Sequence, residues 1–249
     1  MILLPIMVQT TNRASESCIF LAGTLHPNPD YALGAMSIYQ SINTFCFMFP
    51  TGFSTSGSSR VGLFLGRNQP TRAKLASNVS LSLASLLSFT MGSILFLTPH
   101  TTFPSLFTSD LNVILQTSYT IPLLAFYVFA DGLQCALQGT IKGCGKQYIV
   151  APIVVFSYWV IGVPLAYYKA FIVNDGAMDC DHAISLCGVR GLIFGLLTGT
   201  WVHMLLLLFV VLFTIDWWEE AVLAGARMSL AKQYVYSRGR TEKNNGCQC

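Results

Sequence analysis

Charged residues are scarce in this sequence. They make up 10% of its 249 positions, whereas a soluble globular domain carries about 25%. Hydrophobic residues reach 53%, and the mean hydropathy is +0.57. A chain this poor in charge would expose large apolar patches in water, which excludes an ordinary soluble domain.

Signatures of several functional classes are also absent. No run of Lys and Arg suits a nucleic-acid-binding face, so we expect no nucleic-acid partner. The eight cysteines follow no metal-ligand spacing, and no metal site is expected. The sequence contains no Ser-His-Asp order, no phosphate-binding loop and no pore-filter sequence, which argues against an enzyme, a cofactor and a channel.

Long apolar runs dominate the chain instead. Spanning the hydrocarbon as a helix takes about 20 apolar residues, and period-2 alternation typical of barrel strands is missing. Six stretches qualify, at about residues 1–23, 31–53, 74–97, 111–139, 148–172 and 192–215. The sequence therefore predicts an all-α integral membrane protein, with a six-helix transmembrane bundle over residues 1–215.

The placement of Lys and Arg predicts the orientation of these spans. Basic residues gather between the second and third spans, between the fourth and fifth, and after the sixth. Because such residues are enriched on the cytoplasmic side, we expect cytoplasmic loops at 60–74 and 142–147 and a cytoplasmic C-terminus. The loop at 175–181 is expected on the opposite side. The predicted location is a plasma membrane or a vacuolar or other endomembrane.

The chain after the sixth span changes character. Asp216-Trp217-Trp218-Glu219-Glu220 favours a short interfacial helix over residues 216–235, because Trp suits the headgroup layer and acidic residues suit the first turn of a helix. Residues 236–249 are polar and predict a disordered cytoplasmic tail. Cys180 and Cys187 share an acidic loop. The sequence is compatible with a disulfide between them and with two unpaired thiols.

Two carboxylates fall inside predicted spans, Glu16 in the first and Asp131 in the fourth. A buried ionised carboxylate costs several kcal/mol unless it is paired or hydrated. Such a group can hold a proton or a cation but not both, and this competition suits a proton/cation exchanger. The alternatives are structural: Arg13 is close enough along a helix to pair with Glu16, and Asp131 could hydrogen-bond a neighbouring helix.

Other polar residues in the spans either line a cavity or bridge helices. Those predicted to line a substrate cavity are Gln40, Asn43, Tyr127 and Tyr158. Pro50, Pro122 and Pro164 also fall inside spans, where proline bends a helix. Bent helices of this kind line cavities in many transporters.

Four stretches resemble one known family of transporters. They are Gly52-Phe53-Ser54-Thr55-Ser56-Gly57-Ser58-Ser59-Arg60-Val61-Gly62, Phe107-Thr108-Ser109-Asp110, Asp131-Gly132-Leu133-Gln134 with Lys142-Gly143-Cys144-Gly145-Lys146-Gln147, and Tyr158-Trp159-Val160-Ile161-Gly162-Val163-Pro164-Leu165. In this order they resemble the eighth-span exit, the loop before the tenth span, the tenth span and the eleventh span of the multidrug and toxic compound extrusion (MATE) family. The resemblance runs from about Leu4 to Met228.

Members of that family have twelve spans in two six-span lobes around a central cavity, and they export organic cations or xenobiotics against H⁺ or Na⁺. The resemblance implies that this chain corresponds to the second lobe of a eukaryotic-type member. It implies proton-coupled efflux with Glu16, seven residues before Gly23, and Asp131 as the coupling residues; Na⁺ is the alternative ion. The implied partners are small organic cations or xenobiotics, the lipid bilayer, and either a first lobe or a second copy of the chain.

The sequence also departs from the family pattern. Leu63 stands where Asn usually follows Arg-Val-Gly, and Ala14-Ser15 replaces an aromatic pair before Glu16. Because the resemblance covers the second lobe only, the alternatives to a working exporter are a truncated half-transporter that is inactive alone, and one that is active as a dimer.

Overall fold

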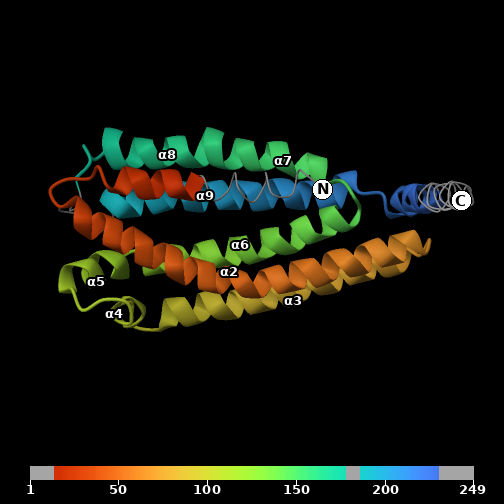
Figure 1. The fold of residues 1–249 in the computed structure, drawn as a ribbon, viewed down its shortest axis with the longest axis horizontal. Coiled ribbons are helices and arrows are strands. Elements are labelled where there is room, and N and C mark those ends of the chain that lie inside the picture. The colour runs from red at the N-terminus through yellow and green to blue at the C-terminus, as the bar shows by residue number, and fades with distance from the viewer. Residues whose placement is uncertain (1–13, 178–185, 230–249) are drawn as a thin grey trace, which may run out of the picture.

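The computed structural model describes residues 14–177 and 186–229, and every regular element in these ranges is helical. Figure 1 shows the helices running side by side along one axis, with two short helices at one end. The elements are a first helix (14–22), α2 (Pro29–Gly66), α3 (Pro70–Leu97), α4 (Thr102–Ser105), α5 (Leu111–Ser118), α6 (Ile121–Gly143), α7 (Gln147–Val155), η1 (Phe156–Gly162), α8 (Val163–Tyr167), η2 (Tyr168–Ile172), α9 (Gly188–Phe209), η3 (Val210–Thr214) and a C-terminal helix (217–229).

Four of these helical runs are long and apolar enough to cross a membrane. They are Pro70–Leu97, Ile121–Gly143, Gln147–Ile172 and Gly188–Thr214, which correspond to the third to sixth predicted spans. The second predicted span lies within α2, and the first is described only from residue 14 onwards. The helical membrane architecture is confirmed, whereas the count of six spans stays a prediction.

The predicted fourth span, 111–139, is wrong as a single helix. The chain forms α5 and then α6, with a break at Tyr119 and Thr120. Pro122 lies in the first turn of α6, where its missing N–H has no partner to lose. This proline therefore starts a helix and does not bend one.

The predicted cytoplasmic loop at 60–74 is also mostly helical, because α2 continues to Gly66 and α3 begins at Pro70. The 38 residues of α2 extend about 57 Å at 1.5 Å per residue, whereas the hydrocarbon core is about 30 Å thick. A helix of this length projects beyond the apolar layer. Basic residues near the end of α2 can therefore lie in a helix outside the apolar layer. The prediction of a loop at 60–74 did not allow for this.

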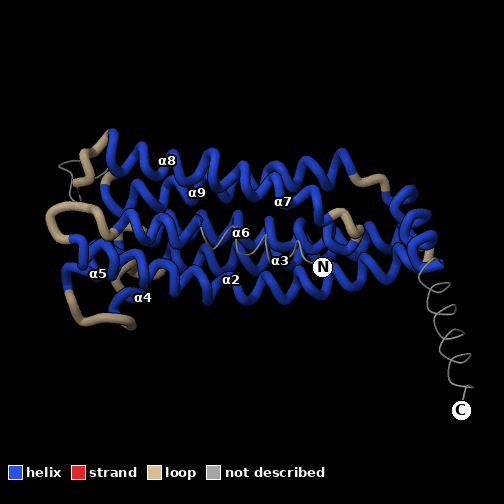
Figure 2. The backbone as a smooth tube through the Cα atoms, turned by 45° about the horizontal axis from the view of Figure 1, so that its top comes forward, coloured by secondary structure: helices blue, strands red, loops and turns tan. Residues whose placement is uncertain are grey.

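Helix α6 is the centre of the bundle (Figures 1 and 2). It is 67% buried over its most apolar stretch, against 28–39% for the other three candidate spans. Glycines allow α2 and α3 to approach it closely. A Cβ on Gly139 would lie 2.5 Å from the Ser54 carbonyl oxygen, and one on Gly132 would overlap Ser88. Small residues at helix contacts are the usual means of packing spans in a membrane.

The predicted fifth span is continuous from Gln147 to Ile172 but not uniformly α-helical. The π-helical segment η1 ends just before α8, whose second residue is Pro164. Proline has no N–H to donate to the preceding turn, and a wide π turn accommodates that loss. The irregular turn brings Tyr158 into the buried interior, where its side chain is 1% exposed.

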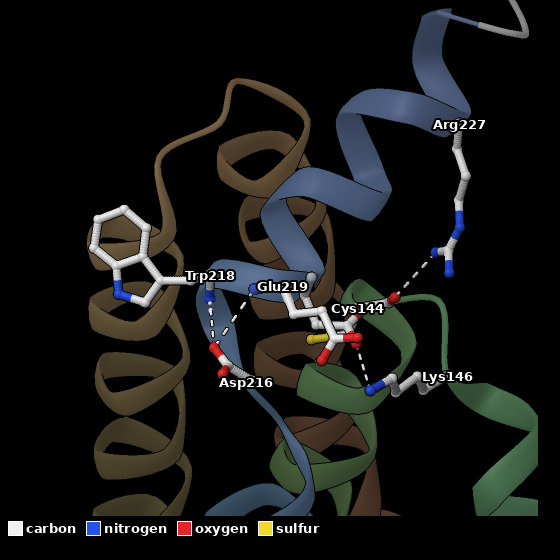
Figure 3. Close-up of polar contacts among 7 residues, drawn as sticks. Cys144, Lys146, Asp216, Trp218, Glu219 and Arg227 are labelled. Carbon is white, nitrogen blue, oxygen red and sulfur yellow. Dashed lines mark hydrogen bonds and ion pairs between the residues drawn. The ribbon is translucent and has the colours of Figure 1, made fainter.

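The C-terminal helix begins at a cap supplied by Asp216. Its Oδ1 accepts a hydrogen bond from the Trp218 N–H at 2.9 Å (Figure 3), as an N-cap carboxylate does. Trp218 is 69% exposed, consistent with the predicted interfacial position. Residues 230–235 of the predicted helix and the tail at 236–249 lie outside the described residues.

Two polar contacts attach the C-terminal helix to the connection between α6 and α7. The Lys146 ammonium pairs with the buried Glu220 carboxylate, and the Arg227 guanidinium donates to the Cys144 carbonyl at 3.3 Å (Figure 3). Burial raises the pKa of the Cys144 thiol to about 12. At the other end of the bundle, Cys187 is disulfide-bonded, and Cys180 lies outside the described residues.

Candidate functional site

A pocket of about 420 Å³ lies between the first helix, α2, α6, the α7–η1 region and α9. Its volume falls in the range of about 300–1,000 Å³ that is usual for small-molecule sites. All six residues that the sequence singles out line it: Glu16, Gln40, Asn43, Tyr127, Asp131 and Tyr158. The tertiary structure thus brings both membrane carboxylates and all four predicted cavity residues together, and their roles stay predictions.

One face of α2 supplies a polar wall of the pocket. Gln40, Asn43, Thr44 and Phe47 all line it, and their spacing places them along one side of a helix. The Ser15 hydroxyl donates to the Gln40 side-chain oxygen at 2.8 Å. This bond ties the first helix, which carries Glu16, to α2.

Asp131 forms the buried end of the pocket. Its side chain is only 5% exposed, whereas Glu16 is exposed. Gln134 lies one turn further along α6, and its amide donates to Asp131. The same amide nitrogen lies 3.4 Å from the Tyr158 hydroxyl. Asp131 is therefore held by a helix-local bond to Gln134, which in turn contacts the α7–η1 region.

A directed chain of hydrogen bonds continues from Tyr158. The Thr200 hydroxyl donates to the Leu196 carbonyl at 3.0 Å, so the Tyr158 hydroxyl donates to Thr200, at 3.1 Å. The Tyr158 oxygen then accepts from Gln134. Every donor in this series of hydrogen bonds has an acceptor, and the series links α6, η1 and α9 through buried side chains.

Among the residues that the structure describes, the pocket lining carries two carboxylates and no Lys, Arg or His. Among the described residues, no cationic side chain pairs with Asp131. Arg13, the proposed structural partner of Glu16, lies outside those residues. Because an ionised carboxylate in a membrane interior is costly without a counter-charge, Asp131 requires a proton, water or a bound cation.

Unpaired acceptor oxygens add to this negative character. Asn43 Oδ1 and Gln134 Oε1 are buried, and no donor in the described ranges reaches either one. Both residues line the pocket. Phe47, Tyr127 and Tyr158 also line the pocket, and Tyr127 packs edge-on against Tyr39 at a centroid distance of 6.3 Å. Oxygens and aromatic faces are the groups that attract an organic cation.

Sequence reasoning missed several residues of the pocket, namely Ser15, Ile19, Thr44, Phe47, Met48, Gln134, Cys135, Gln138, Val154 and Leu196. Helical spacing could have found part of this set. Gln134 and Gln138 follow Asp131 by three and seven positions on the same helix, which places them on one face. No such signal points to Leu196, because α9 reaches the pocket only through packing.

The fold and the pocket define a class: a helical membrane protein with an acidic, aromatic cavity between its membrane-spanning helices. The chain matches the family model described as MatE over residues 5–168. It is 34% identical to Protein DETOXIFICATION 16 of Arabidopsis thaliana, over 86% of this chain and 41% of that protein. It is 30% identical to Protein DETOXIFICATION 36 of the same plant, over 86% of this chain and 40% of that protein.

A solved structure agrees with these relatives. The crystal structure of the eukaryotic MATE transporter AtDTX14 matches with a TM-score of 0.78 and 27% identity, over 89% of this chain and 46% of that one. The chain belongs to the MATE family, whose members are transporters for multidrug and toxic compound extrusion and not enzymes. It spans about two fifths of the length of the curated relatives that it matches.

Proposed function

We propose that this chain forms the cation- and proton-binding half of a secondary transporter that exports organic cations or xenobiotics in exchange for protons. The observation that supports the proposal is one pocket whose described lining residues include two carboxylates and no Lys, Arg or His. A pocket of this charge favours cations over neutral or anionic compounds. Its aromatic residues and its volume suit an amphiphilic cation.

The proposed coupling is competition for the same carboxylates. An ionised Asp131 or Glu16 stabilises a bound cation, and a protonated one does not. Proton uptake therefore favours cation release, and proton loss restores the cation site. The two bound states need different conformations of the transporter for exchange to move a cation across the membrane. We expect alternating access, with H⁺ as the coupling ion and Na⁺ as the alternative.

The test is dye efflux driven by an imposed pH gradient in vesicles. Glu16→Gln and Asp131→Asn keep side-chain size and hydrogen bonding but cannot exchange a proton, so each should abolish pH-driven efflux. Asp110→Asn is the matched control: Asp110 caps α5 outside the pocket, and Asn is an equally good N-cap. Efflux by Glu16→Gln with an unchanged pH dependence would remove Glu16 from the mechanism.

Arg13→Ala separates the coupling role of Glu16 from the structural alternative. If Glu16 only pairs with Arg13, the variant removes an ion pair of an exposed carboxylate, which should lower the free energy of unfolding by about 1 kcal/mol or less and leave the pH dependence of efflux unchanged. If Glu16 is a coupling residue, the variant should retain its fold and change the pH dependence of efflux. A Na⁺ gradient imposed at constant pH then distinguishes the two coupling ions.

The alternative function is that of a half-transporter that is inactive alone or active as a dimer. This alternative is motivated by coverage, because the chain matches only 41% of the first relative and 46% of the solved structure. Three preparations distinguish the possibilities: the chain alone, the chain with a six-span first lobe from a relative, and a covalently linked tandem of two copies. Efflux by the tandem alone favours the dimer, and efflux only with the first lobe favours a two-lobe transporter.

A further inference from the structure

A second groove lies between α2 and α3, away from the acidic pocket (Figures 1 and 2 show the two helices side by side). Its volume is about 540 Å³. The residues that define this hairpin groove include two guanidinium groups and a row of apolar side chains: Arg60, Arg72, Phe53, Phe64, Leu75 and Leu83.

The floor of the hairpin groove is a close contact between the two helices. A Cβ on Gly57 would lie 2.8 Å from the Ser80 Cβ, and the Ser80 hydroxyl donates to the Phe53 carbonyl at 3.1 Å. On the α3 side the apolar wall faces outwards, with Leu75 63%, Val79 47% and Leu83 45% exposed. Because α3 is long and apolar enough to cross a membrane, we expect these exposed side chains to face lipid.

The two arginines lie at the same end of the hairpin groove. Arg60 is six residues before the end of α2, and Arg72 is the third residue of α3. Both are exposed, and no described carboxylate forms an ion pair with either one. Residues 31–109 contain no Asp or Glu at all. Arg72 donates to the Gln69 side-chain oxygen at 3.3 Å, a neutral acceptor, so the positive charge at this end of the groove can bind an anion from outside the chain.

The length of the groove matches one leaflet of a bilayer. Arg60 to Phe53 is about 10 Å and Arg72 to Leu83 about 16 Å along the helices, at 1.5 Å per residue. Half of a 30 Å hydrocarbon core is about 15 Å. A phosphate bound at the arginines would thus lie at headgroup depth, with an apolar path of one acyl chain below it.

We propose that the hairpin groove binds one anionic phospholipid, with its phosphate between Arg60 and Arg72 and an acyl chain along the apolar walls. Basic pockets between membrane helices bind such headgroups through paired donors. The positive-inside pattern places this lipid in the cytoplasmic leaflet. The lipid would tie α2 to α3 and thereby support the opposite face of α2, which lines the acidic pocket.

Lipid retention by the full chain tests the proposal. The chain is assembled in nanodiscs of phosphatidylcholine with a minor fraction of phosphatidylglycerol, and native mass spectrometry measures how many phosphatidylglycerol molecules remain bound. We expect the unaltered chain to retain one phosphatidylglycerol molecule. Arg60→Gln with Arg72→Gln should weaken retention about thirtyfold, from roughly 1 kcal/mol per basic residue. Both residues are exposed, so the double variant should fold.

The matched control is Arg67→Gln with Lys74→Gln, which removes the same charge from the same hairpin at positions outside the groove lining. Retention of phosphatidylglycerol by this control variant should be nearly unchanged. Equal weakening by both double variants would show that the general positive surface potential attracts the lipid, and would contradict a specific site. Val79→Trp fills the apolar path and should weaken retention with all four charges intact. Full competition by soluble glycerol phosphate, or no retained lipid in the unaltered chain, would overturn the proposal.

Discussion

At the scale of single residues, a series of hydrogen bonds with one consistent donor direction organises the buried end of the acidic pocket. The Gln134 amide donates to Asp131 and Tyr158, the Tyr158 hydroxyl donates to Thr200, and the Thr200 hydroxyl donates to a backbone carbonyl. The position of the Asp131 carboxylate thus depends on groups from three helices. Hydrogen bonds between membrane helices are individually modest, but several linked ones define a single arrangement.

Tyr158→Phe keeps the ring and removes the hydroxyl from the middle of this chain. We expect it to lower the free energy of unfolding by about 0.6–1 kcal/mol, measured by thermal unfolding in detergent. Thr200→Val should cost a similar amount, because it breaks the same bond. The double variant should cost clearly less than the sum of the two; strict additivity would contradict the contact.

At the scale of whole helices, close packing depends on glycines that face backbone atoms. A Cβ on Gly195 of α9 would lie 2.4 Å from the Ala166 nitrogen in α8. Backbone cannot move aside as a flexible side chain can, so the two helices would have to separate. The wall of the acidic pocket contributed by Leu196 belongs to the same stretch of α9.

Gly195→Ala should therefore lower the free energy of unfolding by about 1–3 kcal/mol through overpacking. Gly52→Ala is the control in another helix, because nothing lies within 4 Å of its added Cβ. That change should be neutral or slightly stabilising, since Ala favours helix over Gly by about 1 kcal/mol. Melting temperatures of the two variants in detergent provide the comparison, and equal destabilisation would refute the packing argument.

The C-terminal helix is held by an ion pair whose pH dependence can be stated. A hydrogen bond with the Glu220 carboxylate raises the pKa of Lys146 above its usual 10.5. A raised lysine pKa stabilises the folded state fully below the unfolded-state pKa, and the gain is lost as pH rises through the higher folded-state value. The pair should therefore stabilise the protein throughout the neutral range.

Lys146→Met leaves Glu220 buried without its partner. We expect a loss of about 1–3 kcal/mol at pH 7, at the lower end because the Lys146 side chain is 17% exposed and partly screened by water. The gap to the unaltered chain should persist to about pH 9 and shrink above pH 10.5. A second change, Glu220→Gln, should recover part of the loss, and a gap that grows at high pH would exclude the ion pair.

At the scale of the whole molecule, the predicted topology depends on α2, which contains the second predicted span. Its 38 residues are long enough to cross the bilayer. Asn28 lies just before its start and Thr71 just after the turn that follows it, and both are exposed. If α2 spans the membrane as predicted, these two positions face the two different aqueous phases.

Asn28→Cys and Thr71→Cys, each in a background with the native cysteines replaced, test this topology with a membrane-impermeant thiol reagent. The positive-inside pattern predicts that Thr71→Cys reacts from the cytoplasmic side and Asn28→Cys only from the other. Labelling of both from one side would contradict a membrane-spanning α2 and the assignment of the C-terminus to the cytoplasm.

The sequence by itself determined the helical class, the approximate spans and the chemically informative residues. Bilayer thickness imposes a length on every apolar run, and the cost of a buried charge makes Glu16 and Asp131 conspicuous without any coordinates. Even so, local patterns missed the break before α6 and the continuation of α2 to Gly66, because Pro122 was expected to bend a span and the basic residues at 60–74 were expected to lie in a loop.

Only the tertiary structure decided which of these residues meet. Glu16 and Asp131 are far apart in the chain and share one pocket, Arg60 and Arg72 share one groove, and Lys146 reaches Glu220. Contacts of this kind depend on which helix faces pack together. That choice is made by the close approach of small residues such as Gly132, Gly139 and Gly195 to distant backbone and side-chain atoms, a property of three-dimensional fit that no local pattern encodes.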